Sequence, residues 1–240
     1  WIHFEDRTWT FGGVNALANR IAAIALDAGL GRDDVVALVM QNRPEYFVIA
    51  WAAFNSGLYF TPVSSRLKRD EIAYIIRDCG AKVFITSPNC AEQVRSLVDG
   101  EPGGPLFFMV DEPEPGFRSW DKEAIAMPTT PIADEVAGYD MLYSSGTTGR
   151  PKGIKRASEN NPIDLPNPFL KILCADMCGM NSDSIYLSPA PLYHAAPLRF
   201  NMMAITLGGT SVIMEHFDAE EFLKLVEKYK ITQSQLVPTM

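Results

Sequence analysis

The sequence predicts an α/β fold in which mostly parallel β-sheets are covered by helices. Short apolar runs alternate with amphipathic patterns of helical spacing along much of the chain, and this alternation is typical of parallel sheets. With 240 residues, 47% of them hydrophobic and 21% charged, the chain can bury a sizeable core. No repeat of fixed short period is evident, which excludes a solenoid.

The first helix is expected between Thr10, which can cap it, and Gly29, which can end it. The apolar positions between these two residues recur at helical spacing. A buried strand follows over residues 35–40. Asn42 then offers a cap three residues before Glu45, at the start of a second apolar helix.

The rest of the chain continues the alternation. Further strands are predicted over residues 59–63, 83–86, 106–110, 140–143, 185–187, 210–214 and 234–237, and further helices over 72–79, 91–98 and 219–229, the last capped by Asp218. An acidic, proline-containing segment over residues 111–134 indicates a surface connection. Residues 1–135 are therefore expected to form a first α/β subdomain that includes this connection, and residues 136–240 to begin a second.

Charge and cysteine content limit the possible partners. The chain has 29 acidic and 21 basic residues and a net charge of -8, so it has no general attraction for nucleic acid or an anionic membrane. Its apolar runs are shorter than the roughly 20 residues that span a bilayer, so no transmembrane segment is predicted. Four irregularly spaced cysteines suit a reducing, cytoplasmic setting. Cys174 and Cys178 are expected to be buried thiols rather than metal ligands.

The two ends of the chain indicate a fragment. The chain begins with Trp1 instead of an initiator methionine, and residues 235–240 form an apolar, strand-like run. A strand that stops without a cap, turn or polar tail suggests a polypeptide cut inside a larger domain. We therefore expect an N-terminal portion of a longer protein.

A Gly/Ser/Thr loop directly after the strand predicted over residues 140–143 carries the strongest local signal. Its residues are Ser144, Ser145, Gly146, Thr147, Thr148, Gly149, Arg150, Pro151, Lys152 and Gly153. Glycines let backbone N–H groups turn toward an anion, the hydroxyls can donate further hydrogen bonds, and Lys152 adds a mobile positive charge. The loop therefore predicts a polyphosphate site.

Two other interpretations of the loop fit less well. A P-loop requires Gly, four residues, then Gly-Lys and Ser or Thr, whereas here Pro151 and Gly153 occupy the second Gly and hydroxyl positions. A flexible Gly/Ser/Thr linker would explain the composition alone. The preceding strand, the Pro-Lys-Gly ending and the absence of a repeat argue against a linker.

The segment from Ser144 to Gly153 resembles the phosphate-binding signature of the adenylate-forming, or AMP-binding, superfamily. This superfamily includes acyl-CoA synthetases, luciferases and peptide-synthetase adenylation domains. Ser144 stands where the family usually has Thr and keeps the hydroxyl. Weaker matches, among them Thr10-Phe11, Pro44-Glu45 and residues 81–83, extend the resemblance over nearly the whole chain. The fold expected is the N-terminal part of the large domain of such an enzyme.

Residues 191–197, Pro-Leu-Tyr-His-Ala-Ala-Pro, resemble a second segment of the superfamily, in which an aromatic residue and a histidine line the carboxylate pocket. A lone histidine is more often structural, but the resemblance favours a functional role for His194. His3 and His216 have no such support. The surroundings of His194 favour an acyl-CoA synthetase over a peptide-synthetase domain.

The resemblance implies that a carboxylate attacks the α-phosphate of ATP and that coenzyme A then displaces AMP from the acyl-adenylate. ATP, Mg²⁺, coenzyme A and a small carboxylic acid, with a fatty acid favoured, are the implied cofactors and substrates. Residues 144–149 and Lys152 would bind phosphates, and Lys152 and His194 would serve catalysis, His194 by positioning the carboxylate.

In the family, the adenine, ribose and magnesium contacts and a C-terminal lysine follow later in the sequence, beyond Met240. The chain alone is therefore expected to be inactive. Another adenylating branch, either peptide synthetase or luciferase-like, and a non-catalytic nucleotide-binding module remain alternatives. The sequence does not predict an oligomeric state.

Overall fold

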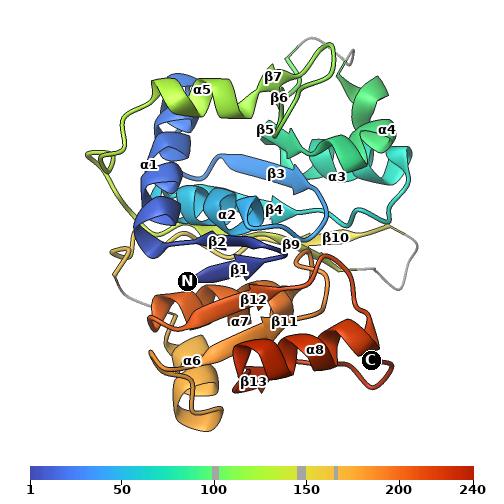
Figure 1. Cartoon of the computed structure of the whole chain (residues 1–240). Helices are drawn as coiled ribbons and strands as arrows, with labels where there is room; N and C mark the ends of the chain where they lie inside the picture. The colour runs from blue at the N-terminus through green and yellow to red at the C-terminus, as the bar shows by residue number, and fades with distance from the viewer. Residues whose placement is uncertain (99–102, 145–149, 165–166) are drawn as a thin grey trace. The chain divides into compact units, whose positions relative to one another are not determined.

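The computed structural model describes residues 1–98, 103–144, 150–164 and 167–240 (Figure 1). Their contacts divide them into two compact units. Unit 1 comprises Trp1–Val14, Asn42–Phe47 and Asp164–Met240, and unit 2 comprises Asn15–Gln41 and Val48–Ile163. In these ranges no helix combines the length and the apolar character needed to cross a membrane.

Unit 2 is built on a six-stranded sheet whose neighbouring strands are all parallel, as predicted. The strand order is β7 (Arg118–Ser119), β6 (Leu106–Met109), β5 (Ala81–Thr86), β3 (Val35–Val39), β4 (Tyr59–Pro62) and β8 (Tyr139–Asp140). Residues 136–144 and 150–163, which the sequence assigns to the start of a second subdomain, make their contacts in unit 2. They do so because β8 pairs with β4 at the sheet edge.

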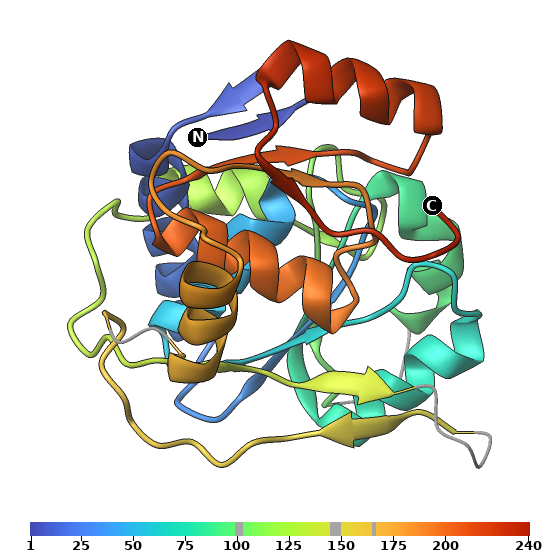
Figure 2. The same cartoon turned by 90° about the horizontal axis from the view of Figure 1, so that it is seen from below.

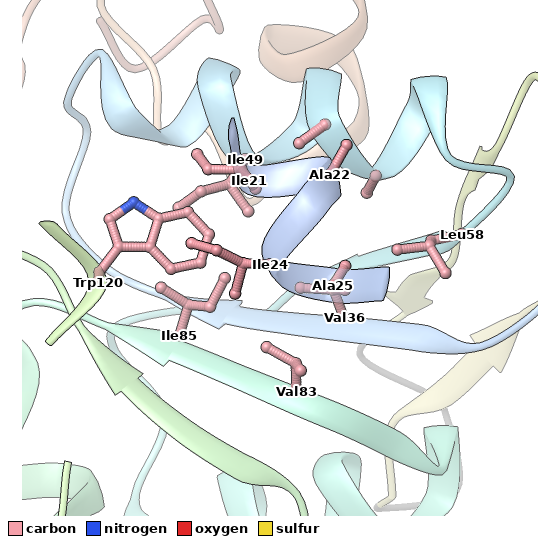
Figure 3. Close-up of a pocket in the computed structure, with 12 residues that line it drawn as sticks. Ile21, Ala22, Ile24, Ala25, Val36, Ile49, Leu58, Val83, Ile85 and Trp120 are labelled. Atoms are coloured by element: carbon pink, nitrogen blue, oxygen red, sulfur yellow. The ribbon is translucent and has the colours of Figure 1, made fainter. Parts of the chain in front are cut away.

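Helices cover both faces of this sheet. Because side chains of a strand alternate between faces, Val36 and Ile85 face α1 (Phe11–Asp27), α2 (Glu45–Asn55) and α5 (Trp120–Ala126), whereas Ala37 and Phe84 face the other way. The opposite face packs on α3 (Arg69–Cys79), α4 (Ala91–Val94) and the flanking 3₁₀ turns Pro88–Cys90 and Arg95–Leu97. The space between α1, α2 and the sheet is lined by apolar side chains (Figure 3). Without polar groups to orient a ligand, it is core packing rather than a binding site.

Unit 1 contains a five-stranded sheet. Its order is β13 (Gln233–Ser234), β11 (Ile185–Ser188), β12 (Thr210–Ile213), β1 (Ile2–Phe4) and β2 (Arg7–Trp9). The β1 and β2 strands pair antiparallel, and the other neighbours are parallel. The sequence pattern did not reveal β1 or β2, because three residues are too few to show a period.

The sheet of unit 1 is also covered on two faces (Figure 2). Tyr186 packs with Cys174 of the π-helical turn Ile172–Met177 and with Met203 of α7 (Ala195–Thr206), beside α6 (Pro168–Lys171). Leu187, the next residue of β11, packs with α8 (Ala219–Tyr229) instead. Alternate residues of β11 thus pack against helices on opposite sides of the sheet.

Two predicted helix caps are confirmed. The Oγ1 of Thr10 accepts a 3.0 Å hydrogen bond from the N–H of Gly13 at the start of α1. The Oδ1 of Asp218 accepts a 2.8 Å hydrogen bond from the N–H of Glu221 in α8. Each side chain satisfies a backbone donor that the first helical turn leaves unpaired.

The cysteines follow the sequence prediction with one exception. Cys79, Cys90 and Cys174 are buried, and all four cysteines are free thiols. Cys178 is exposed, so the prediction that it is buried is wrong. It follows the π-helical turn directly, and this turn carries its side chain out of the cluster around Cys174.

Candidate functional site

The predicted phosphate loop spans the two strands of a β-hairpin in unit 2. The strands β9 (Leu142–Ser144) and β10 (Lys152–Ile154) pair antiparallel, and Ser144 and Lys152 are Cα partners at the end of the ladder. Both side chains are exposed. The hairpin therefore brings the first hydroxyl of the motif and its lysine to the same place.

Other parts of the predicted motif lie outside the described residues. Ser145, Gly146, Thr147, Thr148 and Gly149 are in this group, so their proposed phosphate contacts stay predictions. The sequence did predict a strand before the loop. In the structure, β8 ends at Asp140 and the hairpin begins at Leu142, and between them the N–H of Met141 donates a 2.8 Å hydrogen bond to the carbonyl of Phe60.

The hairpin is attached to helix α3 by a polar contact that the sequence did not reveal. The hydroxyl of Tyr143 donates a 2.6 Å hydrogen bond to Oδ2 of Asp78, and the hydroxyl of Tyr74 lies 3.3 Å from Oδ1 of the same carboxylate. The guanidinium of Arg150 lies 5.5 Å from the centroid of the Tyr74 ring, in cation–π geometry. Residues on both flanks of the loop, Tyr143 and Arg150, therefore contact α3.

Gly153, the last residue of the motif, lies close against two neighbouring side chains. A Cβ at this position would lie 2.6 Å from Cε of Met141 and 2.9 Å from Cζ of Tyr143. Neither distance is compatible with van der Waals contact between carbon atoms. The glycine therefore lets β10 approach β9 and the side chains that attach the hairpin to α3.

His194 lies in unit 1, on the connection between β11 and α7. It is the N-cap residue of α7, its side chain is exposed, and its N–H donates a 3.2 Å hydrogen bond to the carbonyl of Pro191. The rings of Tyr193 and His194 are 4.6 Å apart between centroids. The predicted pair of an aromatic residue and a histidine is thus presented together on a turn.

The topology of unit 1 favours a ligand site near this turn. The chain leaves β11, passes through α7 to β12, and then returns through α8 to β13 on the other side of β11. α7 and α8 cover opposite faces of the sheet. Open α/β sheets bind ligands outside the carboxyl ends of their strands, at a point where the connections change direction. His194 follows the carboxyl end of β11 at such a point.

The prediction that Asn42 caps α2 is wrong. Helix α2 begins at Glu45, so Asn42 lies too far before it to be the cap residue. Its amide instead donates to the carbonyls of Ala190, at 3.0 Å, and Met214, at 2.9 Å. Its Oδ1 accepts a 2.8 Å hydrogen bond from the N–H of Leu192. Asn42 therefore belongs to the surroundings of the His194 turn.

A second buried asparagine supports the other side of the turn. The amide of Asn201 in α7 donates 2.7 Å hydrogen bonds to Oγ of Ser188 and to the carbonyl of Pro197. Its Oδ1 accepts a hydrogen bond from the hydroxyl of Ser211. These contacts fix the end of β11 against the first turn of α7. The three partners lie 13, 4 and 10 positions from Asn201 along the chain.

The candidate ligands for a metal ion are the acidic, histidine and cysteine side chains that the structure describes. Within the ranges given above, no group of three or more His, Cys, Asp or Glu side chains is arranged to bind a metal ion. Magnesium prefers carboxylate and other oxygen ligands in octahedral geometry. In nucleotide sites it is usually held by one or two carboxylates together with substrate phosphates, so the implied Mg²⁺ stays a prediction and no chemical step is assigned to it.

Known proteins are similar in sequence to this chain over nearly its full length. A feruloyl-CoA synthase of an Amycolatopsis species is 33% identical over 233 residues, which cover 93% of this chain and 43% of the relative. A 2-succinylbenzoate–CoA ligase of Bacillus pumilus is 27% identical over 241 residues, covering 99% of this chain and 45% of the relative. The chain thus spans less than half the length of these relatives.

Solved structures show the same fold. A crystal structure of a putative long-chain-fatty-acid CoA ligase from Rhodopseudomonas palustris superposes with a TM-score of 0.84 at 22% identity, covering 99% of this chain and 59% of that one. These values confirm the predicted fold of the N-terminal part of an adenylate-forming enzyme.

A family model described as AMP-binding enzyme matches residues 1–240. The match confirms the resemblance that the motif over residues 144–153 indicated. Because it extends over the whole chain, this protein belongs to the AMP-binding enzyme family.

Proposed function

We propose that this chain supplies the triphosphate-binding and carboxylate-binding part of an ATP-dependent CoA ligase. The observation that carries the proposal is the pairing of Ser144 with Lys152 at the base of the loop, in a chain of the AMP-binding enzyme family. A hydroxyl and a cation at one end of a hairpin suit a polyphosphate. Membership in the AMP-binding enzyme family supports the triphosphate of ATP as that polyphosphate.

In the proposed reaction, a substrate carboxylate oxygen attacks the α-phosphorus of ATP, and the bond to pyrophosphate breaks. The thiolate of coenzyme A then attacks the acyl carbon, and AMP leaves with the electrons of the acyl–oxygen bond. Lys152 offsets negative charge on the leaving pyrophosphate, and the residues from Ser144 to Gly149 donate hydrogen bonds to it. His194 positions the carboxylate for attack.

The carboxylic acid substrate is proposed as a chemical class rather than as a single compound. Names among the relatives include 2-succinylbenzoate, ferulate and long-chain fatty acids. We keep a fatty acid as the first candidate, supported by the 27% identity to a long-chain-fatty-acid–CoA ligase, FadD13, of Mycobacterium tuberculosis. An aromatic acid is the second candidate, supported by the 33% identity to the feruloyl-CoA synthase.

The cytoplasmic location that the cysteine content suggested stays a prediction.

The test uses the longest natural product of the gene that encodes this chain. ATP–pyrophosphate exchange is measured with palmitate, ferulate and 2-succinylbenzoate in turn, and the CoA thioester is identified by mass spectrometry. Exchange and thioester formation with one acid class are expected. Absence of exchange with every carboxylic acid, together with absence of ATP binding in calorimetry, would contradict the proposal.

A further inference from the structure

Asn42 makes three hydrogen bonds through its side-chain amide, two as donor and one as acceptor. The side chain is 5% exposed, and its Nδ2 carries two hydrogens, which the carbonyls of Ala190 and Met214 accept. Its Oδ1 accepts the N–H of Leu192. A buried polar group that is hydrogen-bonded through both its donor and its acceptor atoms restrains its partners, because losing one of these bonds leaves an unpaired group away from water.

These three hydrogen bonds connect segments that are remote in the sequence. Asn42 is 148 residues from Ala190, 150 from Leu192 and 172 from Met214. Ala190 and Leu192 lie just after β11, and Met214 directly follows β12. One side chain thus fixes the backbone at the carboxyl ends of two adjacent parallel strands.

The fixed backbone leads directly into His194. Leu192 precedes His194 by two residues, and the N–H of His194 bonds the carbonyl of Pro191. The carbonyl of His194 in turn accepts a 3.2 Å hydrogen bond from the N–H of Leu198 in the first turn of α7. The position of the His194 backbone is therefore determined between the Asn42 contacts on one side and α7 on the other.

We propose that Asn42 is a positioning residue for His194, and the proposal rests on the carboxylate-binding role of His194 given above. Asn42 does not itself contact the acid. It sets the turn over residues 190–194, and a displacement of that turn by about 1 Å moves His194 out of the geometry that attack requires, at a cost of about 100-fold in rate. Residue 42 thus acts on the first half-reaction through backbone geometry.

The experiment uses the full-length natural protein, three single variants and one double variant. Asn42→Ala removes the three hydrogen bonds. Asn19→Ala is the matched control, because Asn19 is also a buried asparagine, 2% exposed, whose amide donates a 2.8 Å hydrogen bond to a distant carbonyl, that of Thr129, in unit 2. His194→Ala tests the residue that Asn42 is proposed to position. Asn42→Ser, which keeps a donor and an acceptor, replaces Asn42→Ala if the latter does not fold.

The first readout is amide hydrogen exchange followed by mass spectrometry, which needs no substrate. Asn42→Ala is expected to exchange about tenfold faster over residues 190–198, while Asn19→Ala retains normal protection there. Unchanged exchange over this segment in a folded Asn42 variant would overturn the inference, whatever the protein's substrate is.

The second readout is pyrophosphate exchange as a function of acid concentration. Asn42→Ala is expected to lower kcat/KM for the acid about 10- to 100-fold and to leave KM for ATP within about threefold of the natural protein. In a His194→Ala background, Asn42→Ala should have almost no further effect. Equal losses in both backgrounds would show a general structural role and refute positioning. If His194→Ala alone keeps full activity, the proposed role of His194 fails, and the inference fails with it for that separate reason.

Discussion

The hydroxyl of Tyr143 donates a 2.6 Å hydrogen bond to Oδ2 of Asp78, which attaches the strand before the predicted phosphate loop to helix α3. Burial, together with this hydrogen bond, raises the pKa of Tyr143 above its ordinary value, so the phenol remains a donor at any physiological pH. Replacing Tyr143 by Phe is expected to lower the free energy of unfolding by about 1 kcal/mol.

The Tyr143→Phe effect is measured by urea denaturation, and KM for ATP in the full-length protein is expected to rise in parallel. Tyr229→Phe is the control, because the Tyr229 ring stacks on His3, with centroids 4.8 Å apart, in unit 1. Equal stability of the Tyr143 variant and the natural protein would mean that the contact with Asp78 contributes nothing to the hairpin.

Lys152 is expected to act through its charge. Its replacement by Ala should lower kcat/KM for ATP about 100-fold, because one cation at a developing charge contributes roughly that factor, and should leave thermal stability unchanged. The control is Lys224→Ala, an exposed lysine of α8 whose ammonium lies 2.8 Å from Glu220. Full ATP affinity and rate in the Lys152 variant would exclude its proposed role.

A methyl group at Gly153 is expected to destabilise the hairpin. The added Cβ would lie 2.9 Å from Cζ of Tyr143, whose ring is held by its hydrogen bond to Asp78, so Gly153→Ala should cost about 1–3 kcal/mol of unfolding free energy. Gly12→Ala should instead be neutral or stabilising, because nothing lies within 4 Å of its Cβ position and the residue is helical. In thermal denaturation, the Gly153→Ala variant should therefore have a lower Tm than the natural protein, whereas the Tm of the Gly12→Ala variant should be unchanged or higher.

Two buried thiols are expected to make stability fall in alkaline solution. Burial raises the pKa of Cys79 and of Cys174 from 9.0 to about 11. Between these values the unfolded chain loses thiol protons that the folded chain keeps, so their stabilising contribution is complete below pH 9.0 and is lost as pH rises toward about 11.

Unfolding by urea over this pH range measures the effect. A Cys79→Ala, Cys174→Ala double variant should show a flatter dependence on pH than the natural protein, whereas Cys178→Ser, at the exposed cysteine, should not. Identical pH profiles for the natural protein and the double variant would refute the assignment to these thiols.

Much of the fold could be predicted because its signals are local. A cap such as Thr10 and a helix-ending glycine such as Gly29 lie within a few residues of the backbone groups they satisfy. A fully buried parallel strand such as Val35–Val39 is apolar at every position. The strands β1, β2 and β10 could not be predicted in this way. Each has three residues, too few to show a period, and is a strand only through its hydrogen bonds to a partner strand.

The candidate site was predicted in part. The composition of residues 144–153 indicated phosphate chemistry, since hydroxyls, glycines and a lysine suit an anion wherever the chain folds. The contact of Tyr143 with Asp78 was missed, because the two residues are 65 positions apart and each is unremarkable in its own sequence window. Only the pairing of β9 with β10 brings Ser144 opposite Lys152.

Asn42 illustrates the difference between what the sequence determined and what only the tertiary structure decided. The sequence by itself determined the parallel α/β architecture and the phosphate motif, because both depend on side-chain chemistry and on periods within short windows. It also offered Asn42 as a helix cap, since Asn commonly fills that role. Only the tertiary structure decided that its amide bonds Ala190, Leu192 and Met214. Partners at that distance along the chain become neighbours only when the strands pair, and a buried amide then bonds the backbone groups that the fold leaves within its reach.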